Sequence, residues 1–363
     1  MSPGFPLFRL PDNVVLSVFR SMEAVELMLL SMISMRTKEI VCSLNLHPEK
    51  ISLDTRASCN LEIRFSPFII CVAFEKFEKR NAERELVEIE RPEKVGFYVT
   101  RIVDYRTFEG LEYFINGTME QDYQWENGTF EVRDYIDHFM EILHHDWIDE
   151  LSVMGDDAYP PEEIQQLVNG LDIRLLSFSD DGSLRISDDD MIIYLNAVKP
   201  TRCFYLDKSP LFAWNHTRMS QFFIQNLDYI VIGDAPLLTL DDLLLMNISE
   251  IQINRTWMIE KDFNRFLKHW IAGSNPRLKY LTVGDDSTTD DREEFERELL
   301  NGIDHRKIPD EEERTCIKRM GTYEECREKM TGGSYIRRKD GAEAIVHAEY
   351  LRFHLILQEL VNF

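Results

Sequence analysis

The chain has 363 residues, of which 44% are hydrophobic and 29% are charged. This ordinary globular composition excludes collagen-like, mucin-like and wholly disordered proteins, and the length leaves room for two or three folded units. The 65 acidic residues against 41 basic ones give a net charge of −24. Such a field repels nucleic-acid phosphates and anionic lipid, so we expect basic or neutral protein partners, with no nucleic acid and no membrane among them.

The first residues, MSPGFPLFRLPD, show no basic segment followed by an apolar one, so we expect no signal peptide. The longest apolar stretch, residues 25–35, is shorter than the about 20 residues that a membrane span needs. None of the six cysteines forms a C-x-x-C pair. We therefore expect reduced thiols in a cytoplasmic or nuclear protein, without a disulfide scaffold or a cysteine zinc site.

Residues 5–46 have the pattern of three short helices. Asp12 is placed to cap the first, whose apolar stripe consists of Val14, Val15, Val18, Phe19 and Met22. Residues 25–33 are apolar nearly all round, and residues 40–44 repeat at helical spacing. Because about forty residues cannot bury that much apolar surface alone, we expect it to pack either on a partner or on the rest of the chain.

Residues 47–130 have the pattern of a strand-rich connecting segment. Apolar alternation or β-branched and aromatic runs predict strands over residues 61–65, 68–74 and 95–102. The dense charge of residues 75–93 is typical of a solvated helix or loop.

Residues 131–363 contain a repeat in which a short apolar strand ends in a small or polar residue followed by a charged one. Four similar strands begin at Leu151, Leu175, Tyr229 and Tyr280, and two weaker copies begin at Cys203 and Glu250. Helical patterns follow these strands. One begins at Pro161 and another begins with a capping box at Thr239. A third has an apolar stripe from Phe263 to Trp270 and ends at Gly273. One strand and one helix in roughly every 20–30 residues predict an α/β fold, a degenerate leucine-rich-repeat-like solenoid, with a doubly wound sheet as the alternative.

The repeat pattern stops after the strand that begins at Tyr280. Residues 286–332 are charged, and we expect them to form helix or loop. Residues 335–347 predict a C-terminal β-hairpin around Asp340-Gly341, placed to cap the last open edge of the sheet.

Candidate chemistry is sparse. Aspartate pairs at the strand ends, such as Asp156-Asp157, Asp180-Asp181 and Asp285-Asp286, fit a divalent metal, but their recurrence before helices favours helix capping. His138, His144 and His145 fall in one predicted helix, residues 137–149, without zinc-site spacing. No phosphate-binding loop or nucleophile motif occurs, so we expect no catalytic residue, no metal and no cofactor, and an enzyme that uses the aspartates remains a third hypothesis.

Two tryptophans also invite a ligand-binding interpretation. Trp270 lies on an apolar helix stripe and is expected in the core, whereas Trp257 follows a strand and is equally compatible with an exposed position.

The N-terminal segment resembles an F-box. Leu10-Pro11-Asp12, Glu26-Leu27 and Ile33-Ser34-Met35-Arg36 follow that pattern without gaps, although Asn13, Met35 and Thr37 depart from it. The resemblance implies docking on the Skp-type adaptor of a cullin–RING ubiquitin ligase. The implied adaptor-binding residues are Leu10, Pro11, Val14, Val15, Val18, Phe19, Leu27 and Ile33.

The remainder is similar to nematode families that join an F-box to a type 2 F-box-associated domain. The stretches that carry this likeness are residues 257–281, Ile336-Arg-Arg-Lys-Asp-Gly341 and the opening residues 5–11. The resemblance implies that the C-terminal domain recognises a protein substrate.

We therefore predict an F-box-like unit over residues 1–46, a connecting segment over 47–130 and a substrate-recognition domain over 131–363. The predicted function is that of the substrate-recognition subunit of an SCF-type ubiquitin ligase. The alternative is a non-ligase interaction module whose degenerate F-box packs on its own chain.

Overall fold

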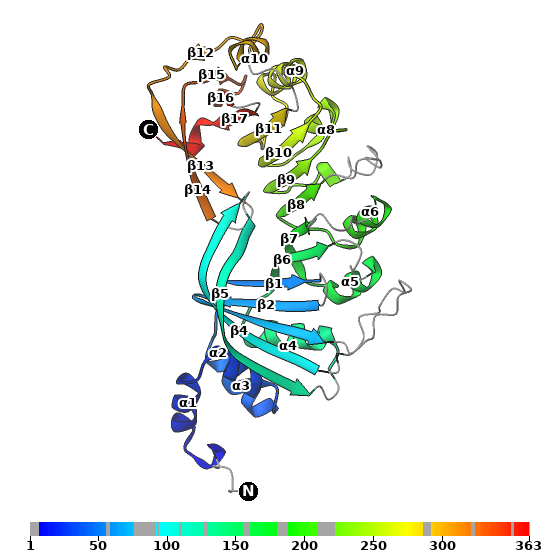
Figure 1. Ribbon diagram of the computed structural model, residues 1–363, viewed down its shortest axis with the longest axis vertical. Coiled ribbons are helices and arrows are strands. Elements are labelled where there is room, and N and C mark those ends of the chain that lie inside the picture. The colour runs from blue at the N-terminus through cyan, green and yellow to red at the C-terminus, as the bar shows by residue number, and fades with distance from the viewer. Residues whose placement is uncertain are drawn as a thin grey trace. The chain divides into compact units, whose positions relative to one another are not determined.

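A computed structural model shows a mixed α/β protein with helices at its N-terminus and extensive β-structure after them (Figure 1). The structure describes residues 7–55, 59–75, 92, 94–108, 111–126, 130–154, 160–179, 188–208, 222–285, 292–320, 324–349 and 352–362. The chain divides into two compact units. The first comprises residues 1–105, 114–151 and 162–172, and the second comprises residues 106–113, 152–161 and 173–363.

The first unit begins with a short 3-10 helix and three α-helices, as the apolar spacing predicts. These elements are η1 (Leu7–Arg9), α1 (Asp12–Arg20), α2 (Ala24–Ser31) and α3 (Met35–Ser43). The expected cap at Asp12 is wrong, because Pro11 occupies the N-cap and Asp12 is the first helical residue. There its carboxylate lies 3.5 Å from the guanidinium of Arg36 on α3.

The strands that lie wholly or mostly in the first unit pair in the order β6-β1-β2-β3-β4-β5. Their bounds are β1 (Lys50–Asp54), β2 (Cys59–Phe65), β3 (Phe68–Glu75), β4 (Lys94–Phe108), β5 (Leu111–Glu126) and β6 (Trp147–Met154). The three strands predicted between residues 61 and 102 are confirmed, whereas β1 and β5 are additional. The charged residues 76–91, expected as helix or loop, lie outside the described part of the chain.

Helix α4 (Val132–Ile142) lies between this sheet and the N-terminal helices. Phe139 makes an edge-on ring contact with Phe97 of β4, while Ser31 and Lys38 bond to His138 and Glu141 of α4. The helix expected over residues 137–149 is wrong in its bounds. It ends at Ile142 because His144 adopts a positive φ of 50°, and the chain then enters β6.

The second unit contains a row of parallel strands in chain order. These are β7 (Asp172–Ser179), β8 (Cys203–Lys208), β9 (Tyr229–Asp234), β10 (Glu250–Thr256) and β11 (Tyr280–Asp285). Each pairs in parallel with the next, so the strands that the repeat predicts are confirmed. The order does not reverse along the row, whereas a doubly wound sheet reverses its order at a switch point.

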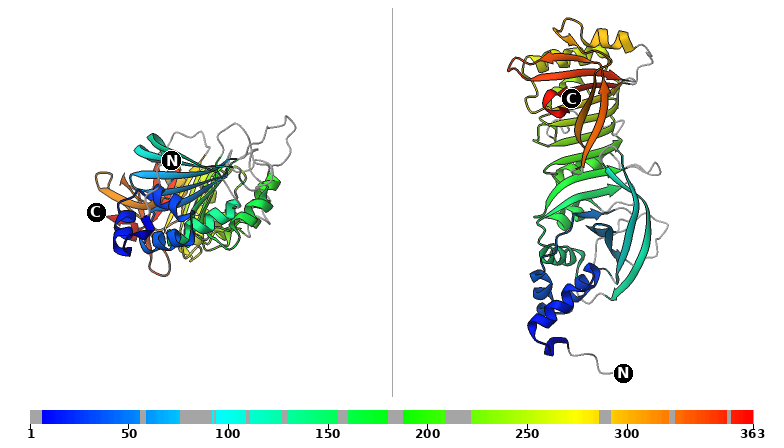
Figure 2. Two further views of the ribbon diagram at one scale, coloured as in Figure 1. Left: turned by 90° about the horizontal axis from the view of Figure 1, so that it is seen from below. Right: turned by 90° about the vertical axis from the view of Figure 1, so that its left-hand side faces the viewer.

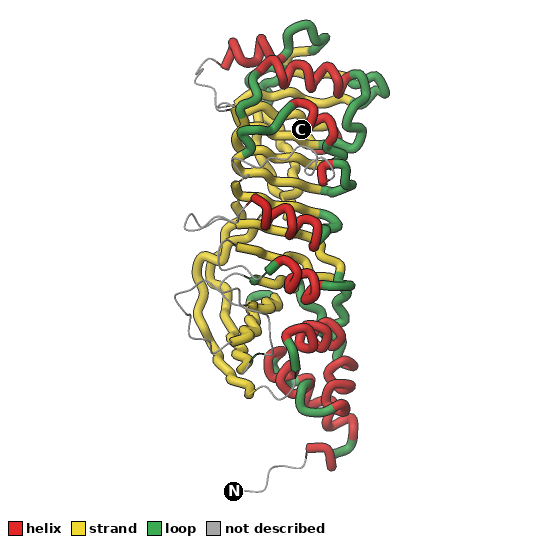
Figure 3. The backbone as a smooth tube through the Cα atoms, turned by 90° about the vertical axis from the view of Figure 1, so that its right-hand side faces the viewer, coloured by secondary structure: helices red, strands yellow, loops and turns green. Residues whose placement is uncertain are grey.

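Helices follow the strands, as the pattern predicts. They are α5 (Pro161–Val168), in the first unit, and α6 (Asp188–Ala197), α8 (Leu240–Leu245) and α9 (Glu260–Ile271) in the second. The predicted capping box is confirmed, because Thr239 Oγ1 accepts from the Asp242 amide while Asp242 accepts from Thr239. Gly273, at φ 105°, ends α9 as expected. Within the second unit, α6, α8 and α9 lie on one face of the strand row (Figure 3).

The strand row of the second unit continues through antiparallel strands from the C-terminal part of the chain. Its order beyond β11 is β17 (Arg352–Leu357), β16 (Glu343–Glu349), β15 (Ser334–Arg337) and β12 (Arg306–Lys307). The hairpin around Asp340-Gly341 is confirmed as β15 and β16. The expectation that it caps the open edge is wrong, because β17 pairs with β11.

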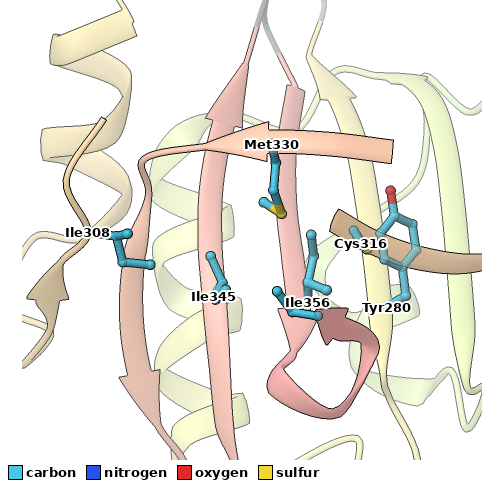
Figure 4. Close-up of a cluster of buried hydrophobic side chains, with 7 residues drawn as sticks. Tyr280, Ile308, Cys316, Met330, Ile345 and Ile356 are labelled. Atoms are coloured by element: carbon cyan, nitrogen blue, oxygen red, sulfur yellow. The ribbon is translucent and has the colours of Figure 1, made fainter. Parts of the chain in front are cut away.

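A small sheet covers the face of this row opposite the helices (Figures 1 and 2). It has the order β14-β13-β18, formed by β13 (Glu313–Met320), β14 (Glu324–Thr331) and β18 (Val361–Asn362). Helix α10 (Arg292–Leu299) fits the expectation for residues 286–332, but β13 and β14 contradict it. The two sheets enclose a core cluster to which Cys316 and Met330 come from the small sheet, and Tyr280, Ile345 and Ile356 from the large one (Figure 4).

Candidate functional site

Helix α1 has a buried face and an exposed face. Val15 and Phe19, one turn apart, are buried in the interior of the first unit. Pro11 and Val14 are exposed and Val18 is half-buried, and their spacing places them along the adjacent stripe of the helix. The motif that predicts an adaptor contact therefore contains residues with two different structural positions.

The turn between α2 and α3 adds further exposed apolar side chains. Ile33 is 60% exposed and Met35 is 70% exposed, whereas Leu27 of α2 is buried. Between them Ser34 caps α3, accepting from the Thr37 amide at 3.3 Å. Thr37, one of the departures from the F-box pattern, is buried and completes this capping box through its own hydroxyl.

Eight residues were predicted to contact an adaptor, and the structure divides them. Val15, Phe19 and Leu27 belong to the core. Solvent reaches the other five, which together with Phe8 and Met35 we name the N-terminal apolar surface: Phe8, Leu10, Pro11, Val14, Val18, Ile33 and Met35. Sequence reasoning missed Phe8 and treated Met35 only as a departure from the pattern. The signal available for both was a large apolar residue flanking a helix start.

Two charged side chains beside this surface, Asp12 and Arg36, are paired with each other. The Arg36 guanidinium lies 4.9 Å from the centre of the Phe8 ring and 3.5 Å from the Asp12 carboxylate. Arg36 therefore links η1, α1 and α3. The result is a largely aliphatic surface next to a charge pair that is already compensated.

The side of α2 and α3 that faces the rest of the first unit is fixed to α4. Nε2 of His138 lies 2.8 Å from Oγ of Ser31, and Nζ of Lys38 donates to Glu141 at 2.7 Å. His144 reaches the carbonyl of Cys42 at 2.8 Å. Burial, followed by the charge of Lys38, lowers the pKa of His138 to about 4, so this histidine is neutral near pH 7.

The third histidine has a structural partner as well. His145 Nε2 lies 3.1 Å from the carboxylate of Asp149, which also accepts from the Trp147 indole and the Ile51 amide. Burial raises the pKa of Asp149, but hydrogen bonds from His145, Ile51 and Trp147 outweigh it and the net pKa is lowered. These bonds connect β6 to β1 within the first unit.

Metal-binding groups are not assembled in the part of the chain that the structure describes, where no cluster of three or more His, Cys, Asp or Glu side chains could hold an ion. Of the aspartates at strand ends, Asp156, Asp157, Asp180, Asp181 and Asp286 lie outside the described residues. Asp234, at the end of β9, forms a bidentate ion pair with Arg255.

The two tryptophans have opposite positions. Trp270 is fully buried on α9, as predicted, and Trp257, for which the sequence left both positions open, is 62% exposed after β10. The Arg338 guanidinium lies 5.1 Å from the centre of the Trp270 ring, and the Lys339 amide donates to the Ile271 carbonyl at 2.9 Å. Two stretches that carried the second resemblance, 257–281 and 336–341, are thus in direct contact.

Among the helices in the described ranges, none is long and apolar enough to cross a membrane.

Comparison with known proteins agrees with both resemblances. Residues 7–49 match the family described as F-box domain, and residues 218–283 match the family described as F-box associated. The F-box associated domain-containing protein sdz-33 of Caenorhabditis elegans is 24% identical over 276 residues, which cover 76% of this chain and 76% of that protein. No solved structure matches the chain. The two resemblances identified from the sequence, to an F-box and to an F-box-associated domain, are therefore confirmed.

Proposed function

Because the chain carries an F-box domain and an F-box-associated domain, we propose that it is the substrate-recognition subunit of an SCF-type ubiquitin ligase. The N-terminal helices bind a Skp-type adaptor and, through it, a cullin. The F-box-associated region binds a protein substrate. The chain itself performs no chemistry in this proposal, since a receptor acts by raising the effective concentration of the substrate beside the conjugating enzyme.

The observation that carries this proposal is the N-terminal apolar surface. Val14, Ile33 and Met35 remain exposed although Val15, Phe19 and Leu27 of the same helical unit are buried. Large apolar side chains gathered on one small helical unit favour a protein partner. The proposed adaptor contact is therefore restricted to the solvent-accessible members of the predicted set: Leu10, Pro11, Val14, Val18 and Ile33.

The second part of the proposal concerns the strand row. The succession of parallel strands with helices on one face supports a degenerate leucine-rich-repeat-like solenoid as the scaffold that presents the substrate. We propose residues 131–363 as this recognition domain, residues 47–130 as the connecting segment and residues 1–46 as the adaptor-binding unit. A cytoplasmic or nuclear location is in keeping with the free thiols of the five described cysteines.

One observation favours the alternative of a non-ligase interaction module. The helices of the F-box pack on α4 of their own chain through Ser31 and Lys38, and on His144 just after it through the Cys42 carbonyl. That packing does not use Val14 or Ile33, which stay exposed. The two hypotheses therefore differ in what they predict for these side chains: an adaptor-binding receptor needs them for binding, whereas a module that packs only on its own chain does not.

The test is calorimetric titration of the full chain with a purified Skp-type adaptor. We expect one-to-one binding that weakens roughly 30-fold or more in the double variant Val14→Asp, Ile33→Asp. Phe19 is not a suitable target, because a buried residue reports folding rather than contact. The matched control is Ile224→Asp, which places the same charge at an apolar residue that is 57% exposed in the second unit.

Equal loss of binding in Ile224→Asp and in the double variant would show that the effect is not local to the N-terminal apolar surface. No binding by the folded wild-type chain would favour the alternative interaction module.

A further inference from the structure

A groove opens in the second unit where the loops after β9 and β10 meet the start of α9. Its volume is about 480 Å³, which is within the range of sites that hold small ligands. We name it the Trp257 groove. Its lining residues are Pro236, Leu237, Leu238, Thr239, Leu240, Asp241, Trp257, Met258, Asp262 and Arg265.

The apolar part of the groove is exposed and held in place. Trp257 is 62% exposed, and Leu237, which lines the groove from the loop after β9, is exposed too. Thr256 and Met258 on either side of the tryptophan are buried, and the Met258 amide donates to Thr256 Oγ1 at 3.3 Å. The indole is therefore presented to solvent from an anchored backbone, as aromatic anchors are at protein interfaces.

The charges of the groove do not cancel completely. Arg265 lies 3.8 Å from the Asp262 carboxylate, which also accepts from the Ile259 amide, so both groups have partners. At the same edge Arg255 is paired with Asp234. Asp241 is exposed, and within the described ranges no hydrogen bond or ion pair engages its carboxylate. The free charge of the groove is negative.

A negative rim beside an exposed indole selects a cationic group. Asp241 and Trp257 line the same groove, and both a carboxylate and an indole ring attract a cation, so a Lys or Arg side chain suits this groove. The neighbouring leucines provide room for an apolar side chain. A phosphate group would be disfavoured at this groove, because Arg255 and Arg265 are already paired with carboxylates and the chain carries a net charge of −24.

We infer that the Trp257 groove binds a protein segment that places a Lys or Arg next to a large apolar side chain. Calling this segment a substrate rests on the proposed function. The inference that the groove binds such a segment does not depend on that function. The inference places recognition at the loops that follow the strands.

The experiment uses the full chain and a library of immobilised hexapeptides, in which one position is fixed in turn to each residue type, phosphoserine included. Wild-type protein is expected to enrich Lys or Arg adjacent to Leu, Ile, Phe or Trp. Trp257→Ala should weaken binding of the best peptide at least tenfold, and Asp241→Asn about two- to fivefold with a weaker salt dependence. Ile224→Ala, which alters an exposed apolar residue outside the groove, should bind as wild type does.

Enrichment of acidic or phosphorylated peptides, enrichment that survives Trp257→Ala, or no enrichment at all would each overturn the inference. Adaptor binding is measured on the same samples. If the chain selects these peptides but does not bind the adaptor, the inference about the groove is supported and the proposed ligase function is contradicted. If it binds the adaptor but selects no such peptide, only the inference about the groove is contradicted.

Discussion

The N-terminal apolar surface and the Trp257 groove are both exposed and apolar, but they differ in charge. Beside the first, Asp12 and Arg36 are paired with each other, and the apolar side chains are mainly aliphatic. The second centres on an aromatic ring and has the Asp241 carboxylate, unpaired within the described residues, on its rim. Free charge discriminates among partners by sign, whereas compensated charge does not. The Asp241 carboxylate can therefore select a partner by charge, whereas the Asp12–Arg36 pair cannot.

This contrast is meaningful only if each surface can be altered without unfolding the framework beneath it.

The largest effect is expected at Phe19. Phe19→Ala removes a fully buried ring, and we expect the free energy of unfolding of the first unit to fall by about 3–5 kcal/mol. Val14→Ala, five residues earlier on the exposed stripe, should change it by about 0.5 kcal/mol or less. Urea titration of the two variants measures both values. Equal destabilisation by the two would mean that α1 has no separate surface.

A smaller effect is expected from the titration of His138. Its pKa of about 4 in the folded chain lies below the ordinary value, so between pH 6.5 and pH 4 the unfolded chain binds the proton more readily. The stabilisation is complete above about pH 6.5 and is lost as the pH falls, on the order of 2–3 kcal/mol over the window.

The measurement is the urea midpoint as a function of pH, compared between wild type and His138→Gln, which keeps a polar group beside Ser31 but does not titrate. The variant should show a shallower slope in this window. Parallel profiles would exclude His138 as the source of the pH dependence at the α2–α4 contact.

The next effect concerns the helix that contributes Asp262 and Arg265 to the groove. Arg338→Ala removes the guanidinium that stacks on Trp270, and we expect a loss of about 2 kcal/mol in the stability of the second unit. Arg338→Lys should recover little of it, since a lysine does not reproduce planar stacking. Thermal unfolding resolves the two. Full recovery by lysine would mean that charge alone, through Asp340, accounts for the effect.

The smallest stability effect is expected for Trp257→Ala. Because the indole is mostly exposed, the unfolding free energy should change by about 0.5 kcal/mol or less. The same thermal unfolding measurement checks this. A loss comparable with that of a buried tryptophan would show that Trp257 belongs to the core and that the groove is not a separate surface.

The sequence predicts the regular parts of this fold because they have strong local patterns. Most strands from β7 to β11 are apolar runs that end in a small or polar residue followed by a charged one. Tyr229–Ile232 of β9 is buried throughout, as is typical of parallel strands. The strands β13 and β14 were missed since charged residues dominate them. Among their described side chains Cys316 and Met330 reach the core cluster, where they contact segments far apart from them in the sequence.

The site shows the same limit. The F-box motif identifies the helices but does not separate Phe19, which is buried, from Val14, which is exposed, because both are apolar and lie in one helix. For Trp257 the sequence left exposure open. Its position depends on how the loops after β9 and β10 come together, and no periodicity within a single segment encodes that.

The pairing of β17 with β11 has a consequence for synthesis of the protein. The edge of β11 stays unpaired until about 70 further residues have been made, which at about 5–20 residues per second takes several seconds. During that interval the nascent chain exposes a row of backbone donors and acceptors that can pair with another strand. A chain whose synthesis ends within this stretch would therefore keep an unpaired strand edge. We expect such a product to bind chaperones rather than a specific partner.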